Sequence, residues 1–207
     1  MMIRQIMICI AALFFSAALT GCSRSPRVSF YTLGGAEKVT TVNPSKSAPS
    51  VTVANLTLPD LVDRPQMVER VNENRVEILE THRWAEPLKN GISRLLAETL
   101  ANQLGSNLVT AYPQNGAGEP DYRVVVDIQR FESMGDKVSV DATWSIRPRA
   151  NPDKTDSLLL TKTGRSQPRE SRGKEGYEAL VAAYNRAIVS VSNDIAETIR
   201  IDWGAGR

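Results

Sequence analysis

Apolar and polar residues alternate without a break through the segment 137–147. Because successive side chains of a strand point to opposite faces, this pattern predicts a strand with one buried and one solvated face. The preceding segment, 122–132, is expected to pair with it as a hairpin across Ser133–Asp136. A third long strand is expected at 157–167. The residues of the second strand that are expected to face the core are Val138, Val140, Ala142, Trp144 and Ile146.

A helical period replaces this alternation in the C-terminal region. Apolar residues there recur at the spacing of one helix face, which predicts a long helix from about Lys174 to Ile201. We expect the apolar face to pack on a sheet, and a coiled-coil surface for a partner is the alternative. The stripe consists of Tyr177, Leu180, Val181, Tyr184, Ile188, Val191, Ile195 and Ile199.

An earlier helix is predicted to begin at Pro87, because proline is tolerated at a first helical position, where its missing N–H costs nothing. It is predicted to stop at Gly105, a residue type that favours helix C-termini. Two helices separated by strands favour an α/β sandwich with a mixed sheet. Shorter strands are expected at 28–33, 51–56, 67–71, 75–80 and 107–111, with a turn at 72–74 and loops at 34–50 and 114–120.

The N-terminus has the layout of a secretory signal, with Arg4 followed by an apolar run from Ile6 to Leu19. The run is shorter than the about 20 residues that a membrane-spanning helix needs. Small or polar residues then precede Cys22, a pattern that resembles the bacterial lipobox. In a lipobox the cysteine thiol is acylated, and a peptidase removes the signal immediately before the cysteine. The alternative is a conventional signal peptide followed by an incidental cysteine.

This layout divides the chain into a lipoprotein signal peptide at 1–21, a lipidated tether at 22–27 and a single α/β domain at 28–207. Cys9 leaves with the signal, so Cys22 is the only cysteine of the mature chain. No disulfide within one mature chain is therefore expected. The tether reaches roughly 20 Å at 3.3–3.6 Å per residue, which keeps the domain close to its membrane.

Charge and motif content argue against several classes of function. The chain carries 25 basic and 23 acidic residues without a basic run, so nucleic-acid binding is not expected. His82 is the only histidine, and we expect it to be exposed or on an edge strand. The chain has no Gly-x-Ser-x-Gly turn, and Gly116–Gly118 lacks the lysine of a phosphate loop. No catalytic residue, cofactor or metal site is expected, although a carboxylate pair such as Asp121 and Asp127 is the minimum that a glycosidase needs.

Several segments together resemble the PqiC-like (YmbA-like) auxiliary lipoproteins of ABC-type transport systems. They follow the order of that family across most of the mature chain, and the Trp-Ala-Glu-Pro-Leu stretch after an Asp-Arg-Pro stretch is the most specific part. The matching segments are Cys22, Tyr31–Leu33, Leu58–Gln66, Arg83–Leu88, Asp127–Phe131 and Tyr177–Ile199 with its Asp194–Ala196.

The resemblance implies an outer-membrane lipoprotein that faces the periplasm and works with a periplasmic MCE-domain protein and an inner-membrane permease. Such assemblies move phospholipid or other hydrophobic molecules between the two membranes. The resemblance also implies an α/β/α sandwich similar to anticodon-binding domains, without an RNA function. Ser23 follows the cysteine, whereas aspartate there resembles an inner-membrane retention signal.

Cys22 is the expected lipid attachment site. Four further residues are candidates for a partner-facing loop surface: Pro59, Arg64, Pro65 and Trp84. The structural alternative is that the prolines shape turns and the tryptophan fills the core. A lipoprotein chaperone or pilotin for outer-membrane protein assembly or secretion is the alternative function, and cell-wall binding is a third.

Overall fold

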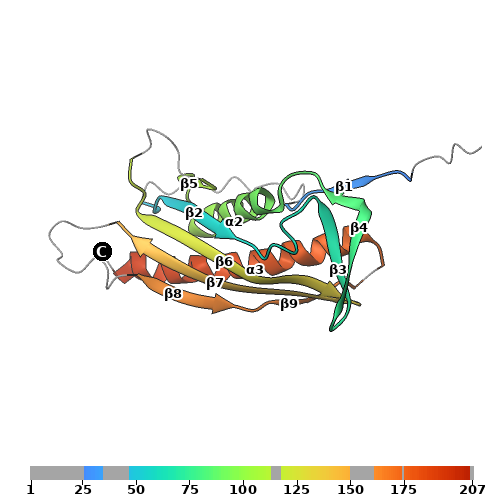
Figure 1. Ribbon diagram of the computed structural model, residues 1–207. Helices are drawn as coiled ribbons and strands as arrows, with labels where there is room; N and C mark the ends of the chain where they lie inside the picture. Colours follow the sequence, from blue (N-terminus) through green and yellow to red (C-terminus); the bar gives the residue numbers. More distant parts are fainter. Residues whose placement is uncertain (1–25, 35–46, 113–117, 150–160, 174, 206–207) are drawn as a thin grey trace, which may run out of the picture.

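The computed structural model describes residues 26–34, 47–112, 118–149, 161–173 and 175–205. Their strands form one nine-stranded sheet in which β7 branches from β6 (Figure 1). The strands are β1 (Ser29–Tyr31), β2 (Val51–Thr57), β3 (Gln66–Asn72), β4 (Arg75–Trp84), β5 (Val109–Thr110), β6 (Tyr122–Met134), β7 (Lys137–Pro148), β8 (Lys162–Ser166) and β9 (Arg169–Ser171). The helices are α2 (Leu88–Leu104) and α3 (Tyr177–Ala205).

The sheet is mixed, as expected from the sequence. Its main path runs β1-β4-β3-β6-β2-β5, and β7 pairs with β6, β8 and β9. The pairs β1–β4, β2–β5, β2–β6 and β3–β6 are parallel, while β3–β4, β6–β7, β7–β8 and β7–β9 are antiparallel. The parallel pairs join segments that are distant in sequence, so the N-terminal strand β1 lies against the end of β4.

The β6–β7 hairpin supplies the centre of the core. All five residues predicted to face inward from β7 are buried, which confirms the expected alternation. On β6 a register shift between Ile128 and Arg130 changes which residues face inward, so that both Ile128 and Phe131 are buried. A bulge of this kind adds one residue to a strand and thereby reverses its alternation.

Both helices cover the same face of the sheet and pack against each other. Every residue of the predicted α3 stripe is buried except the half-buried Tyr177, which confirms that this face packs on the sheet. α2 begins one residue later than predicted, with Pro87 at the N-cap, and ends at Gly105 in the left-handed conformation with φ 61°. In the described part of the chain, neither helix is long and apolar enough to cross a membrane.

The opposite face of the sheet, which we call the open face, is crossed by a chain of ion pairs. Arg70 binds Glu132 at 2.7 Å, and Arg130 lies 3.7 Å from Glu132 and 3.3 Å from Asp141. Arg169 reaches the other oxygen of Asp141 at 2.6 Å. Two arginines therefore compensate the buried Asp141 carboxylate, and the chain makes this part of the open face polar.

The structure differs from the sequence expectations at several boundaries. β4 continues to Trp84, α3 starts at Tyr177, and β1 spans fewer residues than 28–33. β9 was not predicted, because its three residues carry no apolar pattern. The signal peptide with Cys22 lies outside the described residues, as do parts of the expected loops and the start of the expected strand at 157–167, namely 35–46, 113–117 and 157–160.

Candidate functional site

The loop between β2 and β3 and the loop between β4 and α2 meet around a cavity of about 370 Å³. We call this cavity the Arg64 pocket. Three of the four residues proposed from the sequence line it, namely Arg64, Pro65 and Trp84. The complete lining is Asp63, Arg64, Pro65, Trp84, Ala85, Glu86, Pro87 and Leu88.

Backbone hydrogen bonds hold the first of these loops in place. The Pro59 carbonyl accepts from the amides of Val62 and Asp63 at 3.0 and 3.2 Å, so Pro59 shapes a turn and does not line the pocket. The Pro65 carbonyl accepts from the Trp84 amide at 2.7 Å, which ties the loop to the end of β4. Because these carbonyls and amides bond to each other, the loop conformation is set before any partner arrives.

Trp84 contributes to the core and to the pocket at once. Its side chain is 6% exposed, and its ring lies 6.3 Å from the rings of both Phe131 and Tyr184 in edge-on contacts. The structural alternative for this residue, a tryptophan that fills the core, therefore describes most of its surface. Pro65, Ala85 and Pro87 form the exposed rim of the pocket.

Charges around the pocket are paired, with one exception among the described residues. Lys89 lies 3.4 Å from Asp63, and Arg94 binds Glu86 at 2.5 Å. The hydrogen bond from Arg94 to Glu86 raises the pKa of the Arg94 guanidinium above its ordinary value. The Nε of Arg64, in contrast, is buried without a hydrogen-bond partner in the described part of the chain. A buried N–H without a partner has an unfavourable free energy, which an acceptor relieves only if the Arg64 side chain moves to meet it.

The only histidine lies in an aromatic cluster next to the pocket. His82 stacks on Tyr177 at 3.6 Å between ring centroids, and its Nδ1 is 2.9 Å from the Tyr31 hydroxyl. The expectation of an exposed or edge histidine is wrong, because β4 pairs with β1 on one side and β3 on the other and leaves His82 half-buried. Burial raises the pKa of the Tyr177 hydroxyl above its ordinary value.

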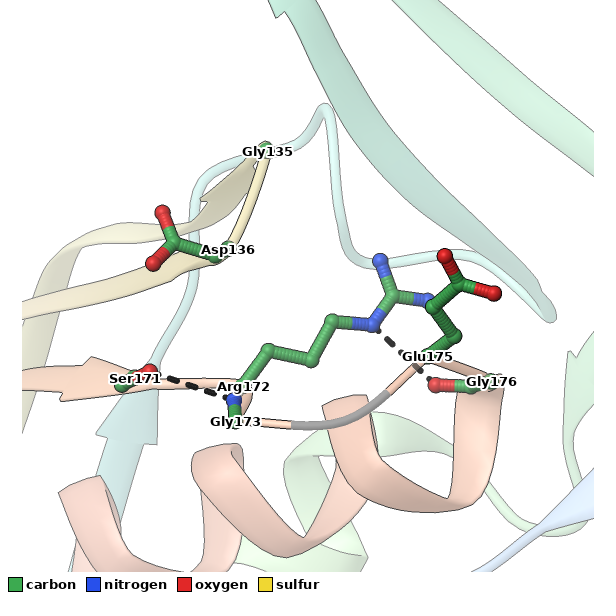
Figure 2. A pocket seen from close by; sticks show the side chains of 7 residues that line it. All are labelled: Gly135, Asp136, Ser171, Arg172, Gly173, Glu175 and Gly176. Carbon is green, nitrogen blue, oxygen red and sulfur yellow. Dashed lines mark hydrogen bonds between the residues drawn. The ribbon is translucent and has the colours of Figure 1, made fainter.

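A second cavity of about 460 Å³ lies between the β6–β7 turn and the start of α3, and Figure 2 shows its lining. Arg172 dominates it, but this arginine binds within the protein. Its Nε donates to the Gly176 carbonyl at 3.1 Å and its Nη1 binds Glu69 at 3.0 Å. Its backbone amide donates to the Asp136 carbonyl at 2.6 Å. Arg172 thus joins β3, the β6–β7 turn and the start of α3. No motif in the sequence indicated this role.

The described residues bring no three metal-ligating side chains of the His, Cys, Asp and Glu types together. The carboxylates of Asp121 and Asp127 each have a structural partner. Asp121 accepts from the Ser50 hydroxyl at 2.7 Å and binds Arg149 at 2.9 Å, and Asp127 accepts from the Thr57 hydroxyl. The Arg64 pocket combines apolar residues with the charged side chains of Asp63, Arg64 and Glu86, an arrangement that suits docking of a protein segment with both apolar and polar groups.

The family model for the ABC-type transport auxiliary lipoprotein component matches residues 31–196. The fold is similar to that in a crystal structure of an uncharacterised protein, with a TM-score of 0.64 and 16% identity over 84% of this chain and 99% of the other. It is also similar to that of a protein from Xanthomonas campestris, with a TM-score of 0.55 and 16% identity over 84% and 98% of the two chains. No curated protein matches the sequence. Because the family model covers most of the chain, including the residues around the Arg64 pocket, the protein belongs to the family of ABC-type transport auxiliary lipoprotein components.

Proposed function

We propose that the protein is an outer-membrane lipoprotein that faces the periplasm and acts as a non-enzymatic auxiliary subunit of an MCE/ABC-type transport system. In this role it helps to move phospholipid or other hydrophobic molecules between the inner and outer membranes and supports envelope integrity. The observation that carries the proposal is the family match over residues 31–196.

The N-terminal sequence supports anchoring through an acylated Cys22. Small or polar residues precede this cysteine, and Ser23 in place of aspartate favours export to the outer membrane. β1 starts at Ser29, so a short tether connects the folded domain to the lipid. A protein anchored in this way presents its domain close to the inner surface of the outer membrane.

We further propose that the Arg64 pocket receives the partner, an MCE-domain protein joined to an inner-membrane permease. Pro65 and Pro87 restrict the backbone at its rim, and its loops are already hydrogen-bonded, so little conformational entropy is lost on docking. The half-buried Arg64 side chain lines the pocket and offers a charged contact to a backbone or carboxylate oxygen of the partner. Apolar surface surrounded by polar groups is the usual composition of a protein–protein interface.

Co-purification from detergent-solubilised envelope tests the proposal. The tagged protein should recover an MCE-domain protein, and Arg64→Ala should weaken that recovery by about 1–2 kcal/mol in apparent affinity, as expected for an interface arginine. Arg147→Ala on β7 is the matched control, since Arg147 is exposed and does not line the Arg64 pocket. Recovery of secretin or porin-assembly proteins instead would favour the alternative role of a chaperone or pilotin.

A further inference from the structure

Phe30 is the most exposed large hydrophobic residue that the structure describes, with 65% of its surface accessible. Val28, two residues earlier, is 42% exposed. Covering exposed apolar surface is favourable, because it removes that surface from water. Both residues lie at the start of the folded domain, within eight residues of Cys22.

The direction in which Phe30 points follows from the pairing of β1 with β4. Tyr31 pairs with Trp84, and Tyr31 contacts Tyr177 at the start of α3, so Tyr31 faces the helices. Neighbouring residues of a strand point to opposite faces. Phe30 therefore projects from the open face of the sheet. β1 itself lies at one end of the molecule in Figure 1, remote from the C-terminal end of α3.

The length and charge of the preceding chain indicate what covers Phe30. Val28 lies six positions after Cys22, a distance of at most about 20 Å at 3.3–3.6 Å per residue. Arg24 and Arg27 lie in this segment, and the sequence has no acidic residue from Cys22 to Ala36. Basic residues next to exposed apolar ones suit the interface of a membrane that contains anionic lipid.

We propose that Val28 and Phe30 insert into the interface of the bilayer that holds the acylated Cys22, and that they orient the domain on that membrane. The inference rests on the proposed lipid anchor. An acyl anchor alone leaves the domain free to rotate on its tether, whereas a second contact at β1 fixes which end faces the lipid. The Arg64 pocket, next to the end of β1, is then held at a set height above the membrane.

The test uses the full mature lipoprotein, reconstituted into vesicles of phosphatidylethanolamine and phosphatidylglycerol. Since acylation consumes the Cys22 thiol, Val28→Cys introduces one free thiol for an environment-sensitive nitrobenzoxadiazole label. We expect blue-shifted emission that doxyl-labelled lipid quenches. Adding Phe30→Ser should shift the emission toward that in water. Adding Ile201→Ser should not, although Ile201 is 62% exposed, because it lies at the far end of the chain.

Every result other than the expected one overturns the inference. Flotation of the protein with the vesicles distinguishes a failure of the membrane contact from a failure of the proposed anchor. Protein that does not float with the vesicles contradicts both. Protein that floats while the label at position 28 emits as in water contradicts only the membrane contact. A label that is shielded from iodide but not quenched by doxyl lipid shows that a second copy covers β1 instead. Lipid quenching that persists with Phe30→Ser shows that Phe30 makes no contact of its own.

Discussion

At the residue scale, Gly164 on β8 pairs with Trp144 on β7, where the Trp144 ring occupies the space beside the glycine. A Cβ atom on Gly164 would lie 2.2 Å from Cζ2 of Trp144. Trp144 cannot easily move away, because its Nε1 donates to the Ser166 hydroxyl at 3.1 Å and that hydroxyl donates to Asp194 on α3 at 2.5 Å. Gly164 thus allows the β7–β8 pair to pack under α3.

Gly164→Ala should therefore destabilise the protein by about 1–3 kcal/mol, the usual effect of overpacking. A change of this size lowers the melting temperature by roughly 2–4 °C per kcal/mol in a protein of this length. Gly118→Ala is the control, because a Cβ at Gly118 meets nothing within 4 Å. Equal melting temperatures for the two variants would show that the Trp144 ring does not constrain Gly164.

His82 tests the non-enzymatic role at the same scale. The imidazole stacks on the ring of Tyr177 and lies within hydrogen-bond distance of the Tyr31 hydroxyl. The proposed function requires no proton transfer from it. His82→Ala should lose the stacking contact, at about 0.5–1.5 kcal/mol of stability. It should still complement the envelope-permeability defect of a strain that lacks this protein and its redundant transporters. A folded and lipidated His82→Ala protein that fails to complement would reopen a catalytic role.

At the element scale, α3 connects the sheet to α2 through its buried stripe. Ile188 is fully buried at its middle, so Ile188→Asp places an unpaired carboxylate in the core. We expect a loss of several kcal/mol, comparable with the whole stability of a domain. Asn193→Asp introduces the same residue on the exposed side of α3 and should change the urea midpoint little. Asp194→Ala removes the acceptor of the Ser166 hydroxyl and lies off the stripe, so it should cost far less than Ile188→Asp. Similar midpoints for Ile188→Asp and Asn193→Asp would contradict the docking of α3.

Elements with a long, regular pattern could be predicted from the sequence, and short or remote pairings could not. The alternation through 137–147 and the α3 stripe each repeat over several residues, so a single period identifies them. β9 is three residues long with no apolar repeat, and β1 joins β4 only after the chain returns from far along the sequence. The Tyr31–His82–Tyr177 cluster depends on that remote pairing, which explains why His82 was expected at an edge.

Some residues of the candidate site could likewise be predicted from the sequence, and others could not. The resemblance located Arg64, Pro65 and Trp84, which the structure brings to one pocket. Pro59 shares their sequence segment but shapes the turn behind them. Asp63 and the four residues Ala85–Leu88 complete the lining. No sequence pattern distinguishes a role of Ala85–Leu88 at the helix start from a role in the pocket. Side-chain burial decides between these roles, and burial depends on the tertiary structure.

At the scale of the whole molecule, the proposed anchor leads directly into β1, and β1 lies next to the Arg64 pocket. The Ala85 amide donates to the Tyr31 carbonyl at 2.8 Å, so the strand that leaves the tether also supports the pocket rim. In the proposed role, the protein therefore holds its partner at a defined position relative to the membrane. A tethered module gains effective concentration from this restriction without any new contact.

Cys22→Ala should remove that restriction. We expect the precursor to remain uncleaved by the lipoprotein peptidase, since the acylated thioether cannot form, and the protein to be absent from the outer-membrane fraction in its mature form. The wild-type protein is the control in the same fractionation, followed by mass spectrometry of the N-terminal peptide. Normal processing and outer-membrane retention of Cys22→Ala would contradict the anchor.

Site-specific photo-crosslinking from the rim of the pocket tests the central claim most directly. A photoreactive amino acid at Pro65 keeps the backbone carbonyl that binds Trp84 and places the reactive group on the exposed rim. The same group at Thr163, exposed on β8, is the matched control. The account predicts an adduct between position 65 and an MCE-domain protein in intact cells, with none from position 163. Adducts from both positions alike, or from position 65 only to secretin or porin-assembly proteins, would contradict it.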